Sequence, residues 1–355
     1  MKNKRKGVAF IDTLKTKVFL QRYGARSDEL GPEVLKRATV CTLNKLVIRS
    51  QEREVNLKPR ISNGPFSGLD MCECPEYATI EVPDEPDFLN RQVAGGKTVG
   101  EIFQFEFNGV ISTTLFGCEL KNMKQACAFC RSAGYSGMKF SLEQFREALE
   151  IITQNMEPSL VLNAGTIPDE YSGYSLISPY VKAARDLNLG SISIELCPPK
   201  QPGTERQLVS WMKDDGVTSA QFNMELYDRN LRRILMPFKG TIPVSSYLRI
   251  LGYSAETFGF GKASTVLLLG IEKAESVMRA AELVLGAGAI PSVEAFRPVP
   301  GSELENLEPA FSVDEIVAIA TEVAGKVLGA LGKDALESRE GCMKCGGCPL
   351  IFDVI

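Results

Sequence analysis

The residues best able to do chemistry in this chain are its cysteines. Ten cysteines are present and no histidine. The lack of histidine excludes Ser-His-Asp and Cys-His catalysis, a histidine zinc site and an imidazole proton shuttle. A transition metal would therefore be held mainly by thiolates, with carboxylates or an exogenous ligand completing its coordination.

One group of cysteines, Cys118, Cys127 and Cys130, has the spacing Cys-x8-Cys-x2-Cys. It follows the apolar run Val110–Phe116, which predicts a strand, and the carboxyl ends of strands are where α/β sites assemble. A zinc site normally has four protein ligands, and no fourth cysteine is near in sequence. Three thiolates at a strand end instead favour a [4Fe–4S] cluster with one open iron. The alternative is a set of buried structural cysteines.

A second group, Cys342, Cys345 and Cys348, has the spacing Cys-x2-Cys-x2-Cys and is followed by proline. This run resembles the ferredoxin-type spacing without its nearby fourth cysteine, and its glycines allow the backbone to turn tightly around a cluster. A zinc site of four thiolates is the alternative. The candidates for a fourth ligand are Cys72 and Cys74, ahead of the cysteines Cys41 and Cys197, which we interpret as buried thiols.

From about residue 106, short apolar runs alternate with segments of helical spacing, which predicts an α/β fold with a parallel sheet, either a barrel or a doubly wound sheet. The expected strands are Val110–Phe116, Ser159–Leu162, Ser191–Glu195, Ala220–Glu225, Thr265–Gly270 and Ser292–Phe296. The expected helices are Leu142–Ile152, Ser178–Leu187, Thr204–Lys213, Ser245–Phe258, Lys273–Leu285 and Val313–Leu331, the last with a capping box of Ser312 and Glu315. The tail from residue 340 is expected to be non-helical.

The composition argues for an ordinary soluble globular chain. Lys plus Arg is 40 and Asp plus Glu is 44, a net charge of −4, which argues against coating nucleic acid or an anionic membrane. The basic start lacks the apolar core of a signal peptide, and no apolar run is long enough to span a membrane. Reduced thiols in a cytoplasmic protein are therefore expected.

At this point the sequence resembles the radical SAM superfamily, in which three cysteines after the first barrel strand bind a [4Fe–4S] cluster whose open iron chelates S-adenosylmethionine. Cys118, Cys127 and Cys130 match these positions, and Phe129 matches the aromatic residue before the last cysteine. The family usually has three residues where this chain has eight between the first two cysteines, although longer gaps occur in some branches.

The resemblance extends over roughly residues 106–330 and implies further cofactor contacts. It places backbone groups of a small-residue turn near the methionine amino group, polar residues near the ribose and amino acid, a cation near the methionine carboxylate, and a glycine beside the adenine. The matching residues are Gly165, Thr166, Gln221, Asn223, Glu225, Lys239, Gly270 and Arg297. Glu195 and Glu294 are candidates for contact with substrate. A carboxylate at position 225 paired with Arg232 or Arg233 is the plainer alternative.

The ending after the sixth strand resembles the biotin synthase and lipoyl synthase branch. This implies a partial (β/α)6 barrel at residues 106–332, with an N-terminal extension at 1–105 that closes its open side and a cluster-binding tail at 333–355. It implies radical chemistry for sulfur insertion, a sulfurtransferase activity, with a second cluster as sulfur source. The substrate would be a small molecule or an acylated carrier protein, and flavodoxin or ferredoxin would donate electrons.

Two other functions remain open. In the first, the second cluster has a ligating or electron-transfer role, and the enzyme catalyses rearrangement, methylation or cofactor maturation. In the second, the chain is a non-catalytic iron–sulfur carrier or a zinc-stabilised binding module, which would not cleave S-adenosylmethionine. A nucleic-acid role is not expected, because a short basic start and a single tryptophan do not make a basic, aromatic surface.

Overall fold

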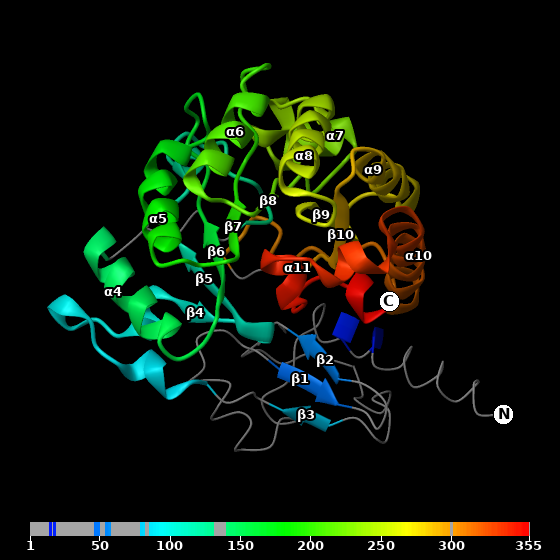
Figure 1. Ribbon diagram of the computed structural model, residues 1–355. Helices are drawn as coiled ribbons and strands as arrows, with labels where there is room; N and C mark the ends of the chain where they lie inside the picture. Colours follow the sequence, from blue (N-terminus) through cyan, green and yellow to red (C-terminus); the bar gives the residue numbers. More distant parts are fainter. Residues whose placement is uncertain are drawn as a thin grey trace.

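A computed structural model describes most of the chain from residue 85 onward (Figure 1). The described residues are 14–15, 17–18, 46–49, 54–57, 79–81, 85–130, 140–298 and 301–354. At 46–49, 54–57 and 79–81 only the backbone is described. There β1 (Leu46–Arg49) pairs antiparallel with β2 (Glu54–Leu57) and β3 (Thr79–Glu81).

The larger sheet has seven strands in the order β10-β9-β8-β7-β6-β5-β4. Its strands are β4 (Gln104–Phe105), β5 (Val110–Thr114), β6 (Ser159–Asn163), β7 (Ile192–Glu195), β8 (Ser219–Gln221), β9 (Ala263–Leu269) and β10 (Ile290–Ala295). The short β4 is antiparallel to β5, and every other neighbouring pair is parallel. The sheet is strongly curved, with helices along its outer side (Figure 1). The expected α/β class with a parallel sheet is thus confirmed.

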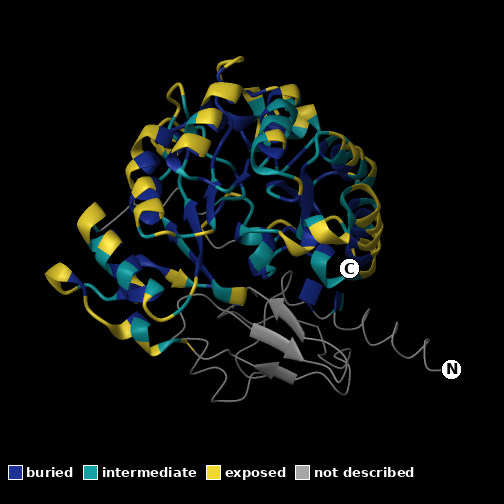
Figure 2. Cartoon of the chain, in the orientation of Figure 1, coloured by how far each residue is buried: buried dark blue, intermediate teal, exposed yellow. Residues whose placement is uncertain are grey.

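The helices are amphipathic and pack their apolar faces on the sheet, leaving exposed residues on the outer surface (Figure 2). They are α3 (Val99–Ile102), α4 (Leu142–Thr153), α5 (Tyr174–Asp186), α6 (Glu205–Asp215), α7 (Arg229–Leu235), α8 (Val244–Phe258), α9 (Ala274–Gly286), α10 (Val313–Glu337) and α11 (Gly341–Cys345). The expected capping box is present at α10, where Ser312 and Glu315 satisfy each other's backbone N–H groups. No described helix is long and apolar enough to cross a membrane.

Two expectations about secondary structure are wrong. The strand expected over Ala220–Glu225 ends at Gln221, because side chains take the place of backbone partners after it: Val266 N donates to Asn223 Oδ1 at 3.1 Å and Met224 N donates to Thr265 Oγ1 at 2.8 Å. Backbone pairing with β9 returns at Glu225, which has a left-handed backbone (φ 64°) and forms a single bridge to Leu267. The tail, expected to be non-helical, forms α11, which ends at Gly346 with φ 72°. A Cys-x2-Cys spacing fits one helical turn, and a glycine that tolerates positive φ is the usual end of such a turn.

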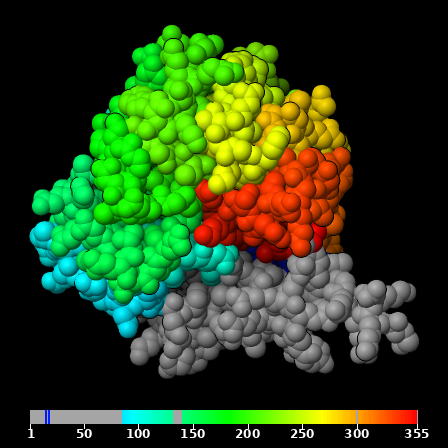
Figure 3. All heavy atoms as spheres, in the orientation of Figure 1, coloured from blue at the N-terminus to red at the C-terminus, as the bar shows by residue number. Residues whose placement is uncertain are grey.

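The tail occupies the concave side of the curved sheet. Gly341 lies so close to β7 that a Cβ there would be 2.7 Å from Ser193 Oγ. Asn108 Nδ2 donates to Lys344 O at 2.9 Å, and Leu350 N donates to Val293 O of β10 at 3.1 Å. In the space-filling view the tail fills the face between the green and the orange parts of the chain (Figure 3). The second cysteine group is therefore inside the curve of the sheet.

Candidate functional site

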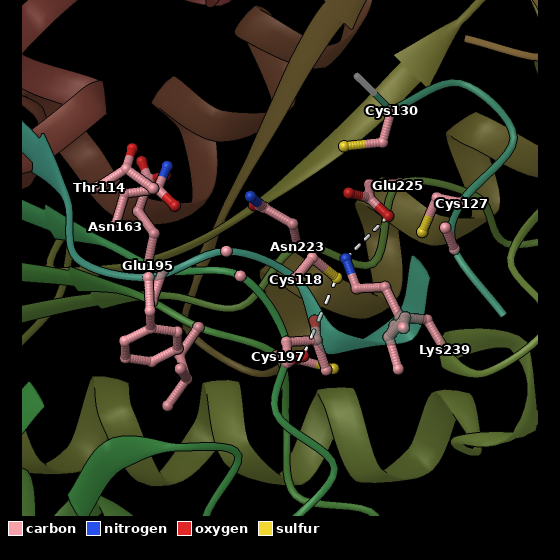
Figure 4. Close-up of a pocket in the computed structure, with 18 residues that line it drawn as sticks. Thr114, Cys118, Cys127, Cys130, Asn163, Glu195, Cys197, Asn223, Glu225 and Lys239 are labelled. Atoms are coloured by element: carbon pink, nitrogen blue, oxygen red, sulfur yellow. Dashed lines mark hydrogen bonds and ion pairs between the residues drawn. The ribbon is translucent and has the colours of Figure 1, made fainter. Parts of the chain in front are cut away.

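A cavity of about 710 Å³ opens at the carboxyl ends of β5 to β8. Its size falls within the usual range for small-molecule and cofactor sites. The three cysteines of the first group, Cys118, Cys127 and Cys130, all line it (Figure 4). The sequence-based expectation that this loop meets the strand ends is therefore matched by the fold.

Backbone hydrogen bonds fix the cysteine loop on both sides. Next to Cys118, Glu119 N donates to Thr166 O at 3.1 Å. Farther along, Ala128 N donates to Leu235 O of α7 at 2.8 Å. The loop between Cys118 and Cys130 is thus held by the turn after β6 and by the end of α7, two elements that are distant from it in sequence.

The close approach of two loops requires a glycine at position 165. A Cβ on Gly165 would lie less than 3.0 Å from Cys118 N and from the carbonyl group of Gly117, a distance that real Cβ atoms essentially never show. Gly165 N also donates to Phe116 O at 2.9 Å. Gly165 therefore has a packing role directly against the first cysteine.

Glu225 and Lys239 form an ion pair on the cavity wall, with Nζ to Oε2 at 3.0 Å (Figure 4). Their side chains are 16% and 10% exposed. Burial lowers the pKa of Lys239, but the charge of Glu225 together with smaller effects of Cys127, Tyr247 and Cys197 outweighs it and holds that pKa well above its usual value. The alternative prediction paired Glu225 with Arg232 or Arg233. For Arg232 this prediction is wrong, because its guanidinium donates to backbone carbonyls instead.

Arg232 is fully buried and builds the loop that carries this pair. Its Nη1 donates to Met224 O at 3.1 Å and Leu226 O at 2.8 Å, and its Nη2 donates to Lys239 O at 3.0 Å and Ile242 O at 3.1 Å. One side chain thereby holds both ends of the segment between Glu225 and Lys239. This role of Arg232 could not be predicted from the sequence, because all four acceptors are backbone carbonyls and every residue type has one.

Burial also affects two thiols of the cavity. It raises the pKa of Cys127 well above the usual value, with the charge of Glu225 adding to the effect. It raises the pKa of Cys197 to about 11. Cys197, interpreted from the sequence as a plain buried thiol, is indeed buried but lines the cavity beside the first cysteine group.

The other end of the cavity has a row of polar side chains. Thr114, Asn163 and Glu195 end neighbouring strands and are directly in register, so they project from the same face of the sheet. Asn163 Nδ2 donates to Glu195 Oε2 at 2.7 Å, and Cys342 Sγ donates to Glu195 Oε1 at 2.7 Å. Glu195 is therefore shared between the cavity and the tail. Thr114 and Asn163 were missed, although a polar residue ending an apolar strand was the available signal.

The remaining tail cysteines have different surroundings. Cys345 is buried against Phe107, Val110 and Val161. Cys348 Sγ accepts a hydrogen bond from Arg297 Nη2 at 3.3 Å. Cys72 and Cys74, the expected sources of a fourth ligand, lie outside the described residues.

Some predicted cofactor contacts line the cavity and others do not. Those that line it are Gly165, Thr166, Asn223, Glu225 and Lys239. Four of the described residues that were predicted to contact the cofactor do not line the cavity: Phe129, Gln221, Gly270 and Arg297. Gln221 accepts from Ser264 Oγ at 3.1 Å, and Gly270 O accepts from Ala310 N at 2.9 Å. The substrate candidate Glu294, on β10, is also outside this wall.

The thiols of the first group are spread around the cavity. In the part of the chain that the structure describes, no three Cys, Asp or Glu side chains lie close enough to share one metal ion. A cluster of several irons holds its thiolates farther apart than a single ion does. The cavity is lined by these three thiols and by the buried thiol of Cys197, so all the sulfur ligands that a metal centre would need there are supplied by thiols.

Comparison with known proteins gives only structural similarities. No protein-family model matches this sequence, and no curated protein matches it. The methylornithine synthase PylB is similar with 17% identity and a TM-score of 0.46, over 70% of this chain and 71% of that chain. The FeFe-hydrogenase maturase HydG has 17% identity and a TM-score of 0.46, over 66% and 52%.

The coproporphyrinogen III oxidase HemN from Escherichia coli, a radical SAM enzyme, has 17% identity and a TM-score of 0.38, over 62% of this chain and 53% of that chain. The match thus spans about half the length of HydG and of HemN. All three TM-scores are below 0.5.

Proposed function

We propose that this chain is a radical SAM enzyme. Cys118, Cys127 and Cys130 would bind a [4Fe–4S] cluster with S-adenosylmethionine on its open iron. When bound and reduced, this pair would supply a 5′-deoxyadenosyl radical that abstracts hydrogen from a substrate carbon. The observation that carries the proposal is that one loop brings three thiols to an open cavity at the carboxyl ends of parallel strands.

The chain's own residues would bind and orient the cofactor. Gly165 and Thr166, next to Cys118, line the cavity and would contact the methionine amino group. Lys239 would attract the methionine carboxylate, and Asn223 and Glu225 would contact the ribose and amino acid. The Glu225–Lys239 pair is preorganised by Arg232, so little reordering is needed on binding.

We further propose that the tail thiols Cys342, Cys345 and Cys348 bind a second iron–sulfur cluster, with Cys72 or Cys74 as a further ligand. The contact between Cys342 and Glu195, which also lines the cavity, supports a second centre that meets the substrate cavity from below. Such a position favours sulfur insertion, as in lipoyl and biotin synthases, or direct binding of substrate. A rearrangement, methylation or cofactor-maturation reaction with a lasting second cluster is the competing proposal.

The polar row of Thr114, Asn163 and Glu195 would orient the substrate, either a small molecule or the acyl group of a carrier protein. Electrons would come from a reduced partner such as flavodoxin or ferredoxin, in the cytoplasm. The (β/α)6 partial barrel would then have its usual radical SAM role of excluding water and competing hydrogen donors.

Anaerobic reconstitution tests the proposal. Iron and labile sulfide are counted per chain for the wild type and for the triple variant C118A/C127A/C130A, and the reduced proteins are assayed for 5′-deoxyadenosine. About eight irons, falling to about four with loss of cleavage, support two cubane clusters. Zinc in place of iron, or cleavage of S-adenosylmethionine that survives the triple substitution, would refute the proposal that the chain is a radical SAM enzyme. Loss of sulfide during turnover would support sulfur insertion over the competing reactions.

A further inference from the structure

The N-terminal part of the chain contributes a buried cation to the tail. Leu14, Lys17 and Val18 are helical and spaced i, i+3, i+4, so they share one helix face. Leu14 and Val18 belong to the main hydrophobic core, and Lys17 is 0% exposed. A lysine on a buried face is costly unless acceptors surround its ammonium, which makes its contacts informative.

The ammonium of Lys17 has three N–H donors and three acceptors in the tail. It donates to Gly346 O at 2.8 Å, to Pro349 O at 2.9 Å and to Asp353 Oδ2 at 2.6 Å. The first two acceptors bracket Cys348 in the sequence. Lys17 thus fixes both ends of the loop Gly346–Pro349, more than 300 residues away along the chain. Simple anchoring would need only apolar contacts, which Leu14 and Val18 already supply.

A second cation reaches the same loop from the sheet. Arg297, which follows β10, donates from Nη2 to Cys348 Sγ at 3.3 Å. The loop also stays next to β10 because Leu350 N donates to Val293 O at 3.1 Å. The segment that carries Cys348 is therefore contacted by two cationic side chains from different parts of the chain.

We propose that Lys17 and Arg297 form a cationic socket that positions the loop Gly346–Pro349 and stabilises an anionic iron–sulfur centre bound by the tail thiols. This inference rests on the proposed second cluster. It gives the N-terminal segment, which has no readable motif, a place in the tail site, with Lys17 as a positioning residue. Lys17 also neutralises the carboxylate of Asp353, and an unpaired negative charge beside the centre would disfavour its reduced form, so Lys17 keeps the reduction potential of the centre higher.

The test uses the full chain carrying C118A/C127A/C130A, in which the tail supplies the remaining proposed cluster. Lys17→Met is compared with the parent and with Lys15→Met, a matched control because Lys15 is on the same helical segment but is 42% exposed and paired with Asp314. Iron per chain and the midpoint potential of the tail centre, followed by electron paramagnetic resonance, are measured. Near-ultraviolet circular dichroism checks that each variant is folded.

We expect Lys17→Met to lose at least half of the tail iron or to bind it at a lower potential, and Lys15→Met to match the parent. Unchanged iron and potential in Lys17→Met would overturn the inference. An equal loss of tail iron in Lys15→Met would also overturn it, because any substitution on this helical segment would then weaken iron binding. If Lys17→Met does not fold, Arg297→Gln is evaluated by the same criteria. If the parent itself binds no iron, the proposed second cluster fails, and this outcome is distinct from failure of the socket.

Discussion

The substitution Gly165→Ala should separate the packing of the cysteine loop from the chemistry of its thiols. It adds one methyl group and removes no ligand, charge or hydrogen-bonding group. That methyl group would lie less than 3.0 Å from Cys118 N and the carbonyl group of Gly117, whereas ordinary contacts begin at 3.4 Å. Both neighbours are backbone atoms, so a side-chain rotation cannot relieve the overlap.

The loop must therefore retreat, by about 1 Å, together with the first cysteine. Overpacking of this kind costs about 1–3 kcal/mol of folding free energy. A displacement of about 1 Å at a reacting group can reduce its rate roughly 10²-fold. We expect Gly165→Ala to remain folded, to bind less of the first cluster and to cleave S-adenosylmethionine roughly 10²-fold more slowly.

The measurements are urea unfolding, iron per chain and 5′-deoxyadenosine formation. Gly325→Ala in α10 is the control, because no atom lies within 4 Å of the added Cβ, and alanine there should stabilise the helix by about 0.5–1 kcal/mol. If Gly165→Ala keeps the wild-type stability, iron content and cleavage rate, the close packing of the two loops is not what positions the first cysteine.

Three further predictions follow from other contacts. Lys239→Met should destabilise the fold by about 3 kcal/mol in urea unfolding, because it leaves the carboxylate of Glu225 buried without its cation, and wild-type stability would contradict this. Glu195→Gln should change the electron paramagnetic resonance spectrum of the tail cluster but not that of the first cluster. An unchanged tail spectrum would argue against a contact between Glu195 and the cluster ligand Cys342. Burial and Asp215 raise the pKa of Tyr174 above 10.0, so this tyrosine stabilises the fold below pH 10 and the contribution is lost as pH rises further. In Tyr174→Phe, stability measured against pH should decline less above pH 10 than in the wild type.

The strands and helices of the α/β part could be predicted because they depend on local patterns. Apolar runs of strand length and amphipathic segments recur in order, and each buried face is visible in the sequence. The prediction failed where a side chain or a distant partner decides the structure. After Gln221 the side chains of Asn223 and Thr265 replace backbone partners of the ladder. The helices α7 and α11 contact residues that are distant in sequence, Ala128 and Asn108.

The sequence by itself determined which chemistry is available. The chain has no histidine and ten cysteines, six of them in two groups of three, so a metal would be held mainly by thiolates. The spacing within each group depends only on neighbours along the chain. The tertiary structure decided which residues surround those thiols. The contacts of Lys17 with the tail, of Glu195 with Cys342 and of Arg232 with its carbonyls join residues whose separation carries no periodic signal. Such contacts arise when the sheet curves and the tail packs inside it, because packing and hydrogen bonding act through space rather than along the chain.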